Sequence, residues 1–303
     1  DIPLQEVIKI EDVFDKRAAN ELAELDMGAP PDALSTFDVA KVAVENHGGD
    51  LSNSDLLVKE GLGSVVGALA HNIPVRLQSP VKRVTWGPDG VIVATKNEVY
   101  RASKLLLTVS AGVLASGAIE FEPELPQWKL DAIAALPMAH FDKIVLFFRD
   151  GALKTSEDGQ WYADLSDSNP LDIFVKPCGA PVVIGMVGGK FDMALQKQES
   201  QAAIEYVMKK LRSIYGDKIE QELVGSFVTD WTGNPNTCGA WAVPKPGFYQ
   251  ARAALKKPIQ NVLYFAGEAC SEKWAGMVPG AYLTGRSAAD EISRELEGEQ
   301  SQS

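Results

Sequence analysis

The sequence contains few of the residues that build metal sites and disulfide frameworks. Its 303 residues include three histidines and three cysteines, namely Cys178, Cys238 and Cys270. The cysteines lie far apart, are odd in number and form no C-x-x-C pair, so neither a disulfide framework nor a zinc site is expected. We therefore predict no metal, and a reducing compartment such as the cytoplasm is the simplest location for these thiols.

The sequence also lacks long apolar runs and an excess of basic residues, and each absence excludes a class of protein. No run of about 18 apolar residues occurs, so no membrane span is expected. Residues 1–4 lack the features of a signal peptide, which leaves open a targeting segment that was cleaved off. Lys and Arg number 29 against 41 Asp and Glu, and the net charge of -12 opposes binding to nucleic acid. The same charge favours solubility and weakly attracts cationic small molecules.

The chain is long enough for two domains, and 46% of its residues are hydrophobic. Apolar spacing predicts helices over residues 5–46, 62–71, 127–136, 199–214 and 277–296. Apolar or alternating runs predict strands over residues 75–77, 81–86, 91–95, 104–110, 142–148, 182–187, 224–231 and 262–266. The Asp89-Gly90 pair between two β-branched runs predicts a hairpin. Because strands and helices mix without regular alternation, we expect a mixed α/β (α+β) fold.

The residues most informative about chemistry follow the predicted strand 262–266. An acid, Glu268, stands at the carboxyl end of this strand, where ligands of α/β sheets bind, and it can accept hydrogen bonds from ribose or ribityl hydroxyls. A helix opens nearby at Gly276 and Met277, and its free N–H groups can stabilise negative charge. Taken alone, the pattern fits close helix–strand packing beside a solvated acid equally well.

This stretch resembles the C-terminal FAD signature of the flavin amine oxidases, which include monoamine, polyamine and L-amino acid oxidases. The signature reads F-x-G-E, a variable loop, and G-x-x-x-G-A, followed by an aromatic residue and a later glycine. The matching residues are Phe265, Gly267, Glu268, Gly276, Gly280, Ala281, Tyr282 and Gly285. The resemblance implies an FAD cofactor bound by Gly267 and Glu268, with Gly276, Met277 and Val278 beside its reduced ring.

Two other segments extend the resemblance. Residues 80–84 match a family strand, and Val81 stands where the backbone meets the adenine. Residues 139–144 match the strand whose lysine holds a water near flavin N5, which makes Lys143 the candidate catalytic residue and directs Phe141 toward the substrate. The alternative for Lys143 is an ordinary lysine at a strand edge.

A fourth matching segment, residues 230–247, supplies aromatic side chains. It resembles the family segment that leads from the substrate sheet to the flavin, so Trp231 is expected beside the cofactor and Trp241 in the cavity wall. Met277 stands where many relatives have a tyrosine, which puts a full aromatic sandwich around the amine in doubt. Trp274 or Trp241 is expected to take that role, although either residue also fits a hydrophobic core.

The family pattern has a part that this sequence lacks. Relatives open with a strand, a G-x-G-x-x-G turn and a helix that hold the FAD pyrophosphate. The nearest match, residues 61–67, has one residue too many between its last two glycines, and no suitable buried strand precedes it. We therefore expect a second polypeptide to supply the G-x-G-x-x-G segment in a heteromer, such as a heterotetramer, in which two chains share one FAD across a large apolar interface.

The resemblance also implies interleaved domains. Residues 1–74 are the helical part of a substrate domain, and residues 75–119 a segment of an incomplete Rossmann-like FAD-binding domain. Residues 120–255 continue the substrate domain, residues 256–296 complete the FAD-binding part, and residues 297–303 form a flexible tail.

The activity that the resemblance implies is oxidative deamination of an amine or amino acid. The α-carbon passes a hydride to flavin N5, the imine hydrolyses, and O2 accepts the electrons to give hydrogen peroxide. L-amino acid oxidases hold the substrate carboxylate with an arginine, and the sequence identifies none. Two alternatives stay open: another flavin oxidoreductase or desaturase of the same fold, and a non-catalytic structural or regulatory subunit.

Overall fold

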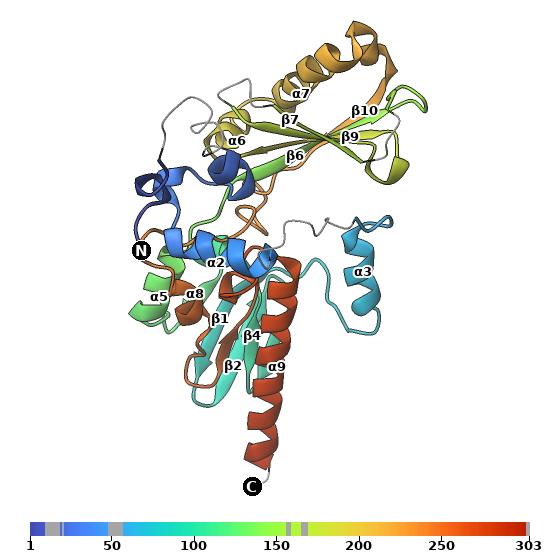
Figure 1. Ribbon diagram of the computed structural model, residues 1–303. Helices are drawn as coiled ribbons and strands as arrows, with labels where there is room; N and C mark the ends of the chain where they lie inside the picture. Colours follow the sequence, from blue (N-terminus) through green and yellow to red (C-terminus); the bar gives the residue numbers. More distant parts are fainter. Residues whose placement is uncertain (10–18, 20, 48–56, 156–158, 165–168, 301–303) are drawn as a thin grey trace.

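The computed structural model describes residues 1–9, 19, 21–47, 57–155, 159–164 and 169–300. Figure 1 shows a five-stranded sheet with two helices in one part of the molecule, and two smaller sheets beside a long C-terminal helix in the other. The mixed α/β architecture expected from the sequence is present. No helix within the described ranges is both long and apolar enough to cross a bilayer.

The first sheet grows from the predicted hairpin. Its strands are β1 (Val81–Gly87), β2 (Gly90–Thr95), β3 (Val99–Ala102) and β5 (Glu120–Glu122), in the order β3-β2-β1-β5. β1 and β2 are antiparallel and close at the Gly87–Gly90 pair. Gly90 has a φ of +119°, and a Cβ atom there would lie 2.5 Å from the Ala102 carbonyl oxygen, so the turn requires glycine.

A pair of short parallel strands lies beside this sheet. β4 (Leu105–Leu107) pairs with β11 (Leu263–Phe265), although the two segments are far apart in the sequence. The chain then enters α4 (Ala111–Ala115) after β4, and η6 (Glu268–Cys270) and α9 (Val278–Gln300) after β11. Helices α5 (Gln127–Ala134) and α8 (Ala251–Lys256) share one hydrophobic core with these strands and with β1 and β2.

The five-stranded sheet is antiparallel throughout, in the order β10-β6-β9-β8-β7. Its strands are β6 (Phe141–Phe148), β7 (Gln160–Asp164), β8 (Leu171–Val175), β9 (Val182–Gly188) and β10 (Leu223–Val228). Helices α6 (Gly189–Leu195) and α7 (Ser200–Tyr215) belong to this part, which has a core of its own that includes Ile144, Leu146 and Val207. Short turns η4 (Pro177–Gly179) and η5 (Asp217–Glu222) complete it. Alternation along β6 buries Asp142 and Ile144 on one face and leaves Lys143 exposed on the other.

The N-terminal residues connect the two parts. The short 3-10 helix η1 (Leu4–Glu6), the π-helix η2 (Glu21–Asp26) and the 3-10 helix η3 (Pro31–Ala33) precede α2 (Thr36–His47), which crosses between the two parts in Figure 1. A third small core, which includes Leu4, Ala23 and Leu34, holds this region together. The helix expected over residues 5–46 is therefore divided into short pieces, and residues 10–18 and 20 lie outside the described part.

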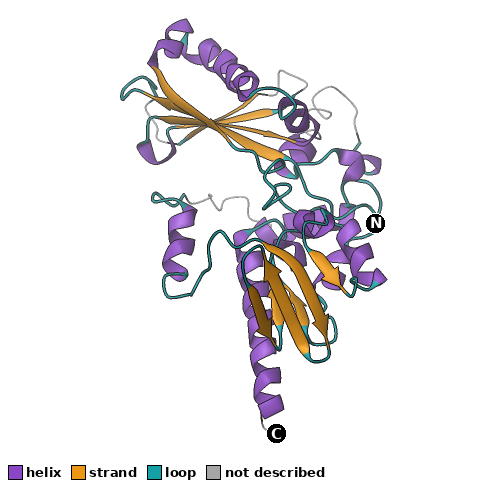
Figure 2. Ribbon diagram, turned by 180° about the vertical axis from the view of Figure 1, so that it is seen from behind, coloured by secondary structure: helices purple, strands orange, loops and turns teal. Residues whose placement is uncertain are grey.

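One helix stands away from the rest of the molecule. The predicted helix over residues 62–71 forms as α3 (Leu62–Leu69), and Figures 1 and 2 both show it separated from the main body. All of its side chains are exposed, including Leu62, Val66 and Leu69. The strand predicted over residues 75–77 was wrong, because these residues form no strand and their side chains are exposed.

The hydrophobic cores divide the chain at positions that the sequence motifs did not predict. Leu125, Ile133 and Leu136 pack into the core of the β1 sheet, whereas Ile144 begins the core of the five-stranded sheet. The expected domain boundary at residues 119 and 120 therefore precedes the point at which the cores separate. α9 continues as a helix to Gln300, into the segment expected as a flexible tail, and residues 301–303 lie outside the described part.

Candidate functional site

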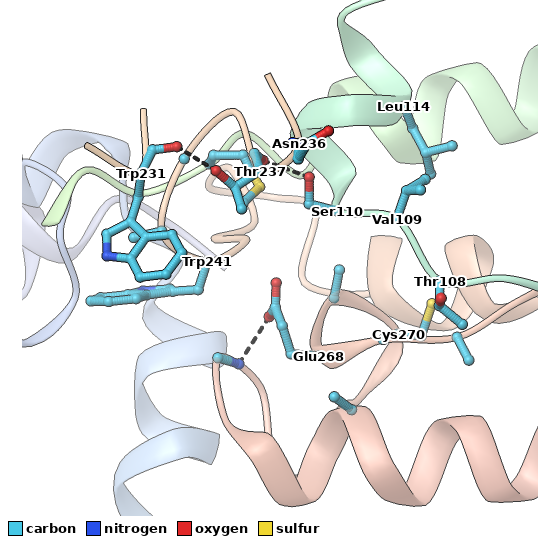
Figure 3. Close-up of a pocket in the computed structure, with 18 of the residues that line it drawn as sticks. Thr108, Val109, Ser110, Leu114, Trp231, Asn236, Thr237, Trp241, Glu268 and Cys270 are labelled. Atoms are coloured by element: carbon cyan, nitrogen blue, oxygen red, sulfur yellow. Dashed lines mark hydrogen bonds between the residues drawn. The ribbon is translucent and has the colours of Figure 1, made fainter. Parts of the chain in front are cut away.

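A cavity of about 810 Å³ lies where the carboxyl ends of β4 and β11 meet the five-stranded sheet (Figure 3). Its walls come from residues 107–110, from β6, from the segment 229–241, from residues 265–270 and from the beginning of α9. The volume lies within the range of about 300–1,000 Å³ that is usual for ligand sites. The fold thus brings three of the four matching sequence segments, residues 139–144, 230–247 and 265–285, around one space.

Glu268 enters this cavity from the end of β11. One carboxylate oxygen accepts a hydrogen bond from the Ala242 N–H at 2.9 Å, and the other accepts from the Gly276 N–H at 3.0 Å. Burial raises the pKa of Glu268, while the nearby Arg252 and the two backbone donors oppose that rise. A carboxylate has about four acceptor positions, so Glu268 can still accept hydrogen bonds from hydroxyl groups in the cavity.

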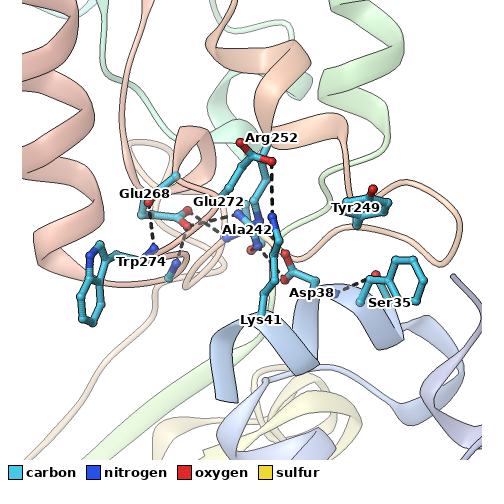
Figure 4. A network of polar contacts seen from close by, with 12 residues as sticks. Ser35, Asp38, Lys41, Ala242, Tyr249, Arg252, Glu268, Glu272 and Trp274 are labelled. Atoms are coloured by element: carbon cyan, nitrogen blue, oxygen red, sulfur yellow. Dashed lines mark hydrogen bonds and ion pairs between the residues drawn. The ribbon is translucent and has the colours of Figure 1, made fainter. Parts of the chain in front are cut away.

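Behind Glu268 lies a buried polar network that the sequence motifs did not identify (Figure 4). Arg252, in α8, donates two hydrogen bonds to Asp38, in α2, and a third to the Ala242 carbonyl. Its Nη1 atom lies 3.9 Å from Glu268 and is buried without a hydrogen-bond partner in the structure. The one sequence signal for this role is a lone arginine among the apolar residues of a short helix, Ala251 to Leu255.

Glycines shape the wall around Glu268. Gly267 has a φ of +140°, and a Cβ atom there would meet nothing within 4 Å, so the backbone is open on that side. Gly280, in the first turn of α9, allows the helix to approach the preceding loop, because a Cβ atom there would lie 2.0 Å from the Trp274 carbonyl oxygen. Val278 begins α9 and lines the cavity, and the first N–H groups of a helix have no intrahelical partner and attract negative charge.

Aromatic side chains and one lysine form the opposite side. Phe141 and Trp241 are in contact, with ring centroids 5.3 Å apart, and the Trp241 indole donates a hydrogen bond of 3.2 Å to the Met27 carbonyl. Figure 3 shows the Trp231 ring beside that of Trp241, with Glu268 next to them. Lys143 and Phe141 line the same cavity, because alternate residues of β6 face the same way.

Not every candidate residue reaches this cavity. Its lining includes Phe141, Lys143, Trp231, Trp241, Gly267, Glu268, Gly276 and Val278. Val81 begins β1 and packs against the adjacent hydrophobic core instead. Met277 lines a smaller cavity of about 150 Å³ on the far side of the Gly276 turn, with Trp241 and Arg252. Trp274 lies in the loop before α9, where its backbone N–H donates a hydrogen bond to the Ser271 hydroxyl. Trp274 is not among the lining residues of either cavity.

The structure also adds residues to the site. Ser110 begins α4 as its N-terminal cap, accepting from the Val113 N–H at 3.0 Å and donating to the Thr237 carbonyl at 2.6 Å. The bond to Thr237 ties the turn after β4 to the loop that carries Trp231, and both Ser110 and Thr237 line the cavity. A serine before a short helix is a common cap, but its bond to a loop far along the chain has no local sequence signal.

Similarity to solved structures agrees with this architecture. A cyclohexylamine oxidase from Brevibacterium oxydans IH-35A superposes with a TM-score of 0.78 at 24% identity, covering 97% of this chain and 67% of that chain. A putrescine oxidase bound to putrescine gives a TM-score of 0.80 at 18% identity, covering 96% of this chain and 68% of that chain. At such identities the likeness establishes the fold.

Sequence relatives give the family. Polyamine oxidase 4 of Oryza sativa subsp. japonica is 31% identical over 278 residues, which are 87% of this chain and 53% of that protein. Polyamine oxidase 2 of Arabidopsis thaliana is 32% identical over 240 residues, covering 78% of this chain and 48% of that protein. The chain thus spans about half the length of these relatives. The model of the flavin-containing amine oxidoreductases matches residues 15–293, and the chain belongs to this family, whose cofactor is a flavin.

Proposed function

We propose that this chain forms the substrate-binding part, and much of the flavin-binding part, of an FAD-dependent oxidase that deaminates an amine with O2 as the acceptor. One observation carries the proposal: Glu268, the beginning of α9, Lys143 and the aromatic residues Trp231 and Trp241 all face one cavity. These residues can hold a flavin and an amine side by side, and they come from segments far apart in the sequence.

The cavity fits a flavin in shape and in chemistry. Gly267 leaves backbone surface open for the close approach of a flat ring, whereas the Cβ position of Gly276 faces the Trp241 ring at 3.5 Å. Glu268 can bind the hydroxyl groups of the ribityl chain, and the N-terminal turn of α9 can stabilise negative charge on the ring. When bound, the flavin accepts the hydride of the substrate and transfers the electrons to O2.

Side chains of this protein bind the amine and a water molecule. Phe141, Trp231 and Trp241 form an apolar wall, which favours the neutral amine that can release a hydride. Lys143 extends from β6 into the same space and is positioned to hold a water molecule for the reaction. Glu268 anchors the cofactor, and Ser110 fixes the loop that carries Trp231.

We propose an aliphatic amine, rather than an amino acid, as the substrate. Among the described lining residues the positive side chain is Lys143, and no arginine is present to hold a substrate carboxylate. Relatives named polyamine oxidases favour the same choice. The net charge of -12 favours the approach of cationic amines.

We also propose that the G-x-G-x-x-G segment for the FAD pyrophosphate comes from a second polypeptide, in a heteromer. Two exposed apolar surfaces support a docking partner. One is α3, where Leu69 is 67% exposed. The other is a row across the five-stranded sheet, where strand pairing aligns Phe227, Val145, Ile184, Phe174 and Trp161 on the face opposite Ile144 and Leu146. Within this row Phe174 is itself buried, stacked against the Trp161 ring. Phe227 and Trp161 are 59% and 56% exposed, and such patches mark interaction sites.

The test is purification of the native protein, with mass spectrometry of its chains, a visible spectrum and peroxide assays on a panel of amines. We expect a flavin spectrum, a second chain with a G-x-G-x-x-G segment, and peroxide release with aliphatic amines. A colourless native protein would refute the function. A flavoprotein that consists of one longer chain would refute the two-chain proposal and leave the function intact.

A further inference from the structure

A third cavity, also small, lies directly behind the wall of the candidate active site. It has a volume of about 150 Å³ and lies between β6, α6 and the end of β10. Three acids line it, namely Asp142, Asp192 and Asp230, and Asp142 and Asp192 are each only 1% exposed. Asp142 is adjacent in sequence to Lys143, but its side chain lies on the other face of β6.

Asp142 acts as an acceptor for the segment that forms the wall. One of its oxygens accepts hydrogen bonds from the Thr229 hydroxyl and, at 3.2 Å, from the Trp231 N–H. Its other oxygen accepts from the Gln196 side chain. The Thr229 hydroxyl in turn accepts from the Lys143 N–H at 2.8 Å. Asp142 therefore connects the strand that carries Lys143 with the loop that carries Trp231.

Asp192 differs from Asp142 because one of its oxygens is buried without a hydrogen-bond partner in the structure. Two ionised carboxylates in a small enclosed space repel each other, and each loses the solvation of water. Burial, followed by the charge of Asp142 and a hydrogen bond with it, raises the pKa of Asp192 to about 7. Asp142 has its own raised pKa, caused by burial and opposed by the bonds from Thr229 and Trp231.

The other groups that face Asp192 carry no positive charge. Among the described residues that line this cavity, α7 contributes Ser200 and Ala203, β9 contributes Val187, and the α6–α7 connection contributes Gln196 and Gln198. Asp230 adds a third negative charge, and it raises the pKa of both other acids. A proton is therefore the neutralising group available to this cluster.

We propose that Asp142 and Asp192 are a pair of positioning residues that share one proton, and that this proton holds segment 229–231 against the Lys143 strand. With Asp192 protonated, Asp142 keeps its negative charge and binds the Thr229 hydroxyl and the Trp231 N–H. When Asp192 loses the proton, repulsion moves the two carboxylates apart and weakens both bonds. The aromatic wall then loses its fixed position, and amine binding weakens. The link to amine binding rests on the proposed function.

The test compares Asp192→Asn with Asp230→Asn in the native flavoprotein. The amide that Asp192→Asn introduces is neutral at every pH and can still donate to Asp142, whereas Asp230 is exposed and its replacement leaves the pair in place. In wild type we expect Trp231 fluorescence, identified by its loss in Trp231→Phe, to change with one proton near neutrality. Asp230→Asn keeps this transition, with its midpoint moved to lower pH. Asp192→Asn abolishes it and keeps the signal of the low-pH form.

Kinetics provide the second measurement. The wild-type KM, corrected for ionisation of the free amine, should rise about tenfold between about pH 6 and about pH 8, while kcat stays nearly unchanged. A tenfold rise is the size expected for the loss of one charge-assisted hydrogen bond. Asp192→Asn should keep the low KM throughout this range. An unchanged fluorescence transition and an unchanged KM profile in Asp192→Asn would overturn the proposal.

Failure of the carboxylate pair and failure of the proposed function give different experimental results. A protein that oxidises no amine at any pH refutes the proposed function, whereas the fluorescence transition requires no turnover and still tests the pair. If the transition persists in Asp192→Asn while amines are oxidised normally, the pair is refuted and the function stands.

Discussion

Arg252 and Asp38 form an ion pair with two hydrogen bonds, of 2.8 and 3.0 Å, and their side chains are only 2% and 5% exposed. The pair joins α8, which shares a hydrophobic core with β4 and β11, to α2 in the N-terminal region. Because Arg252 also lies beside Glu268 and binds the Ala242 carbonyl, this one contact connects the N-terminal residues to the carboxylate that we propose as the anchor of the cofactor.

Removal of either partner of this pair should strongly destabilise the protein. Arg252→Met or Asp38→Asn leaves a buried group without its partner, and we expect a loss of about 3–5 kcal/mol in the free energy of unfolding. Urea denaturation measures the change. The exposed pair Lys41–Glu272 also involves α2, and Lys41→Ala should cost about 1 kcal/mol or less. Equal losses in the two experiments would contradict the role given to Arg252.

Two glycines of α9 should respond in opposite ways to alanine. At Gly280 a Cβ atom would lie 2.0 Å from the Trp274 carbonyl, so Gly280→Ala must displace either the helix or the loop, and we expect a lower melting temperature and weaker flavin retention. At Gly285 a Cβ atom meets nothing within 4 Å. Gly285→Ala should therefore stabilise the isolated chain by up to about 1 kcal/mol through helix propensity. Thermal unfolding of the two variants decides this.

Lys129 should be a structural lysine. Its side chain is fully buried, and its ammonium group donates to the carbonyls of Ala254, Leu255 and Lys257 at the end of α8. Lys129→Met leaves these carbonyls without a donor, and we expect a loss of about 1–3 kcal/mol in unfolding free energy. The exposed Lys256 of the same helix is the control, and Lys256→Met should change stability little.

Lys143→Met tests the catalytic role directly. In the native flavoprotein we expect reoxidation of the reduced flavin by O2 to slow by about 100-fold, as for the loss of a positioned proton-transfer group, with amine binding largely retained. Stopped-flow absorbance measures the rate. Lys82→Met, at an exposed position of β1 outside the cavity, should behave as wild type. If Lys143→Met reacts with O2 at the wild-type rate, the lysine has no catalytic part.

The pH dependence of stability should reveal Asp192. Its pKa is about 7 in the folded protein against an ordinary value of 3.8, so between these values the folded state holds a proton that the unfolded state has released. The free energy of unfolding should therefore fall as the pH rises from about 4 toward about 7. Asp192→Asn removes this contribution, whereas Asp230→Asn should keep the decline. Urea midpoints at several pH values provide the comparison.

The sequence predicted those parts of the fold that depend on neighbouring residues. The β1–β2 hairpin follows from β-branched runs around Asp89-Gly90, and α7 and α9 follow from regular apolar spacing. Val75 and Leu77 have strand-like side chains, but pairing requires a partner strand, and the described residues provide none. Short strands such as β5 and β7 escaped prediction because packing, rather than a long local pattern, determines them.

The candidate site was predictable to the extent that short motifs carry it. Glu268, Gly276 and Lys143 were identified from the family resemblance, and the structure brings them to one cavity. Arg252 and Asp38 lie 214 positions apart, and Asp142 and Thr229 lie 87 apart, so no local pattern connects them. Buried polar groups of this kind become visible only when the fold places their partners beside each other.

The pairing of β4 with β11 has a consequence for biosynthesis. Leu105 cannot pair with Leu263 until β11 has left the ribosome, whereas the antiparallel sheet from Phe141 to Val228 can be completed earlier. Closing so long a loop is slow, and domains generally form as they emerge. The ribosome-bound chain can therefore carry a folded five-stranded sheet before β4 and β11 pair, so the proposed cofactor-binding part, which includes η6 and α9, forms after that sheet.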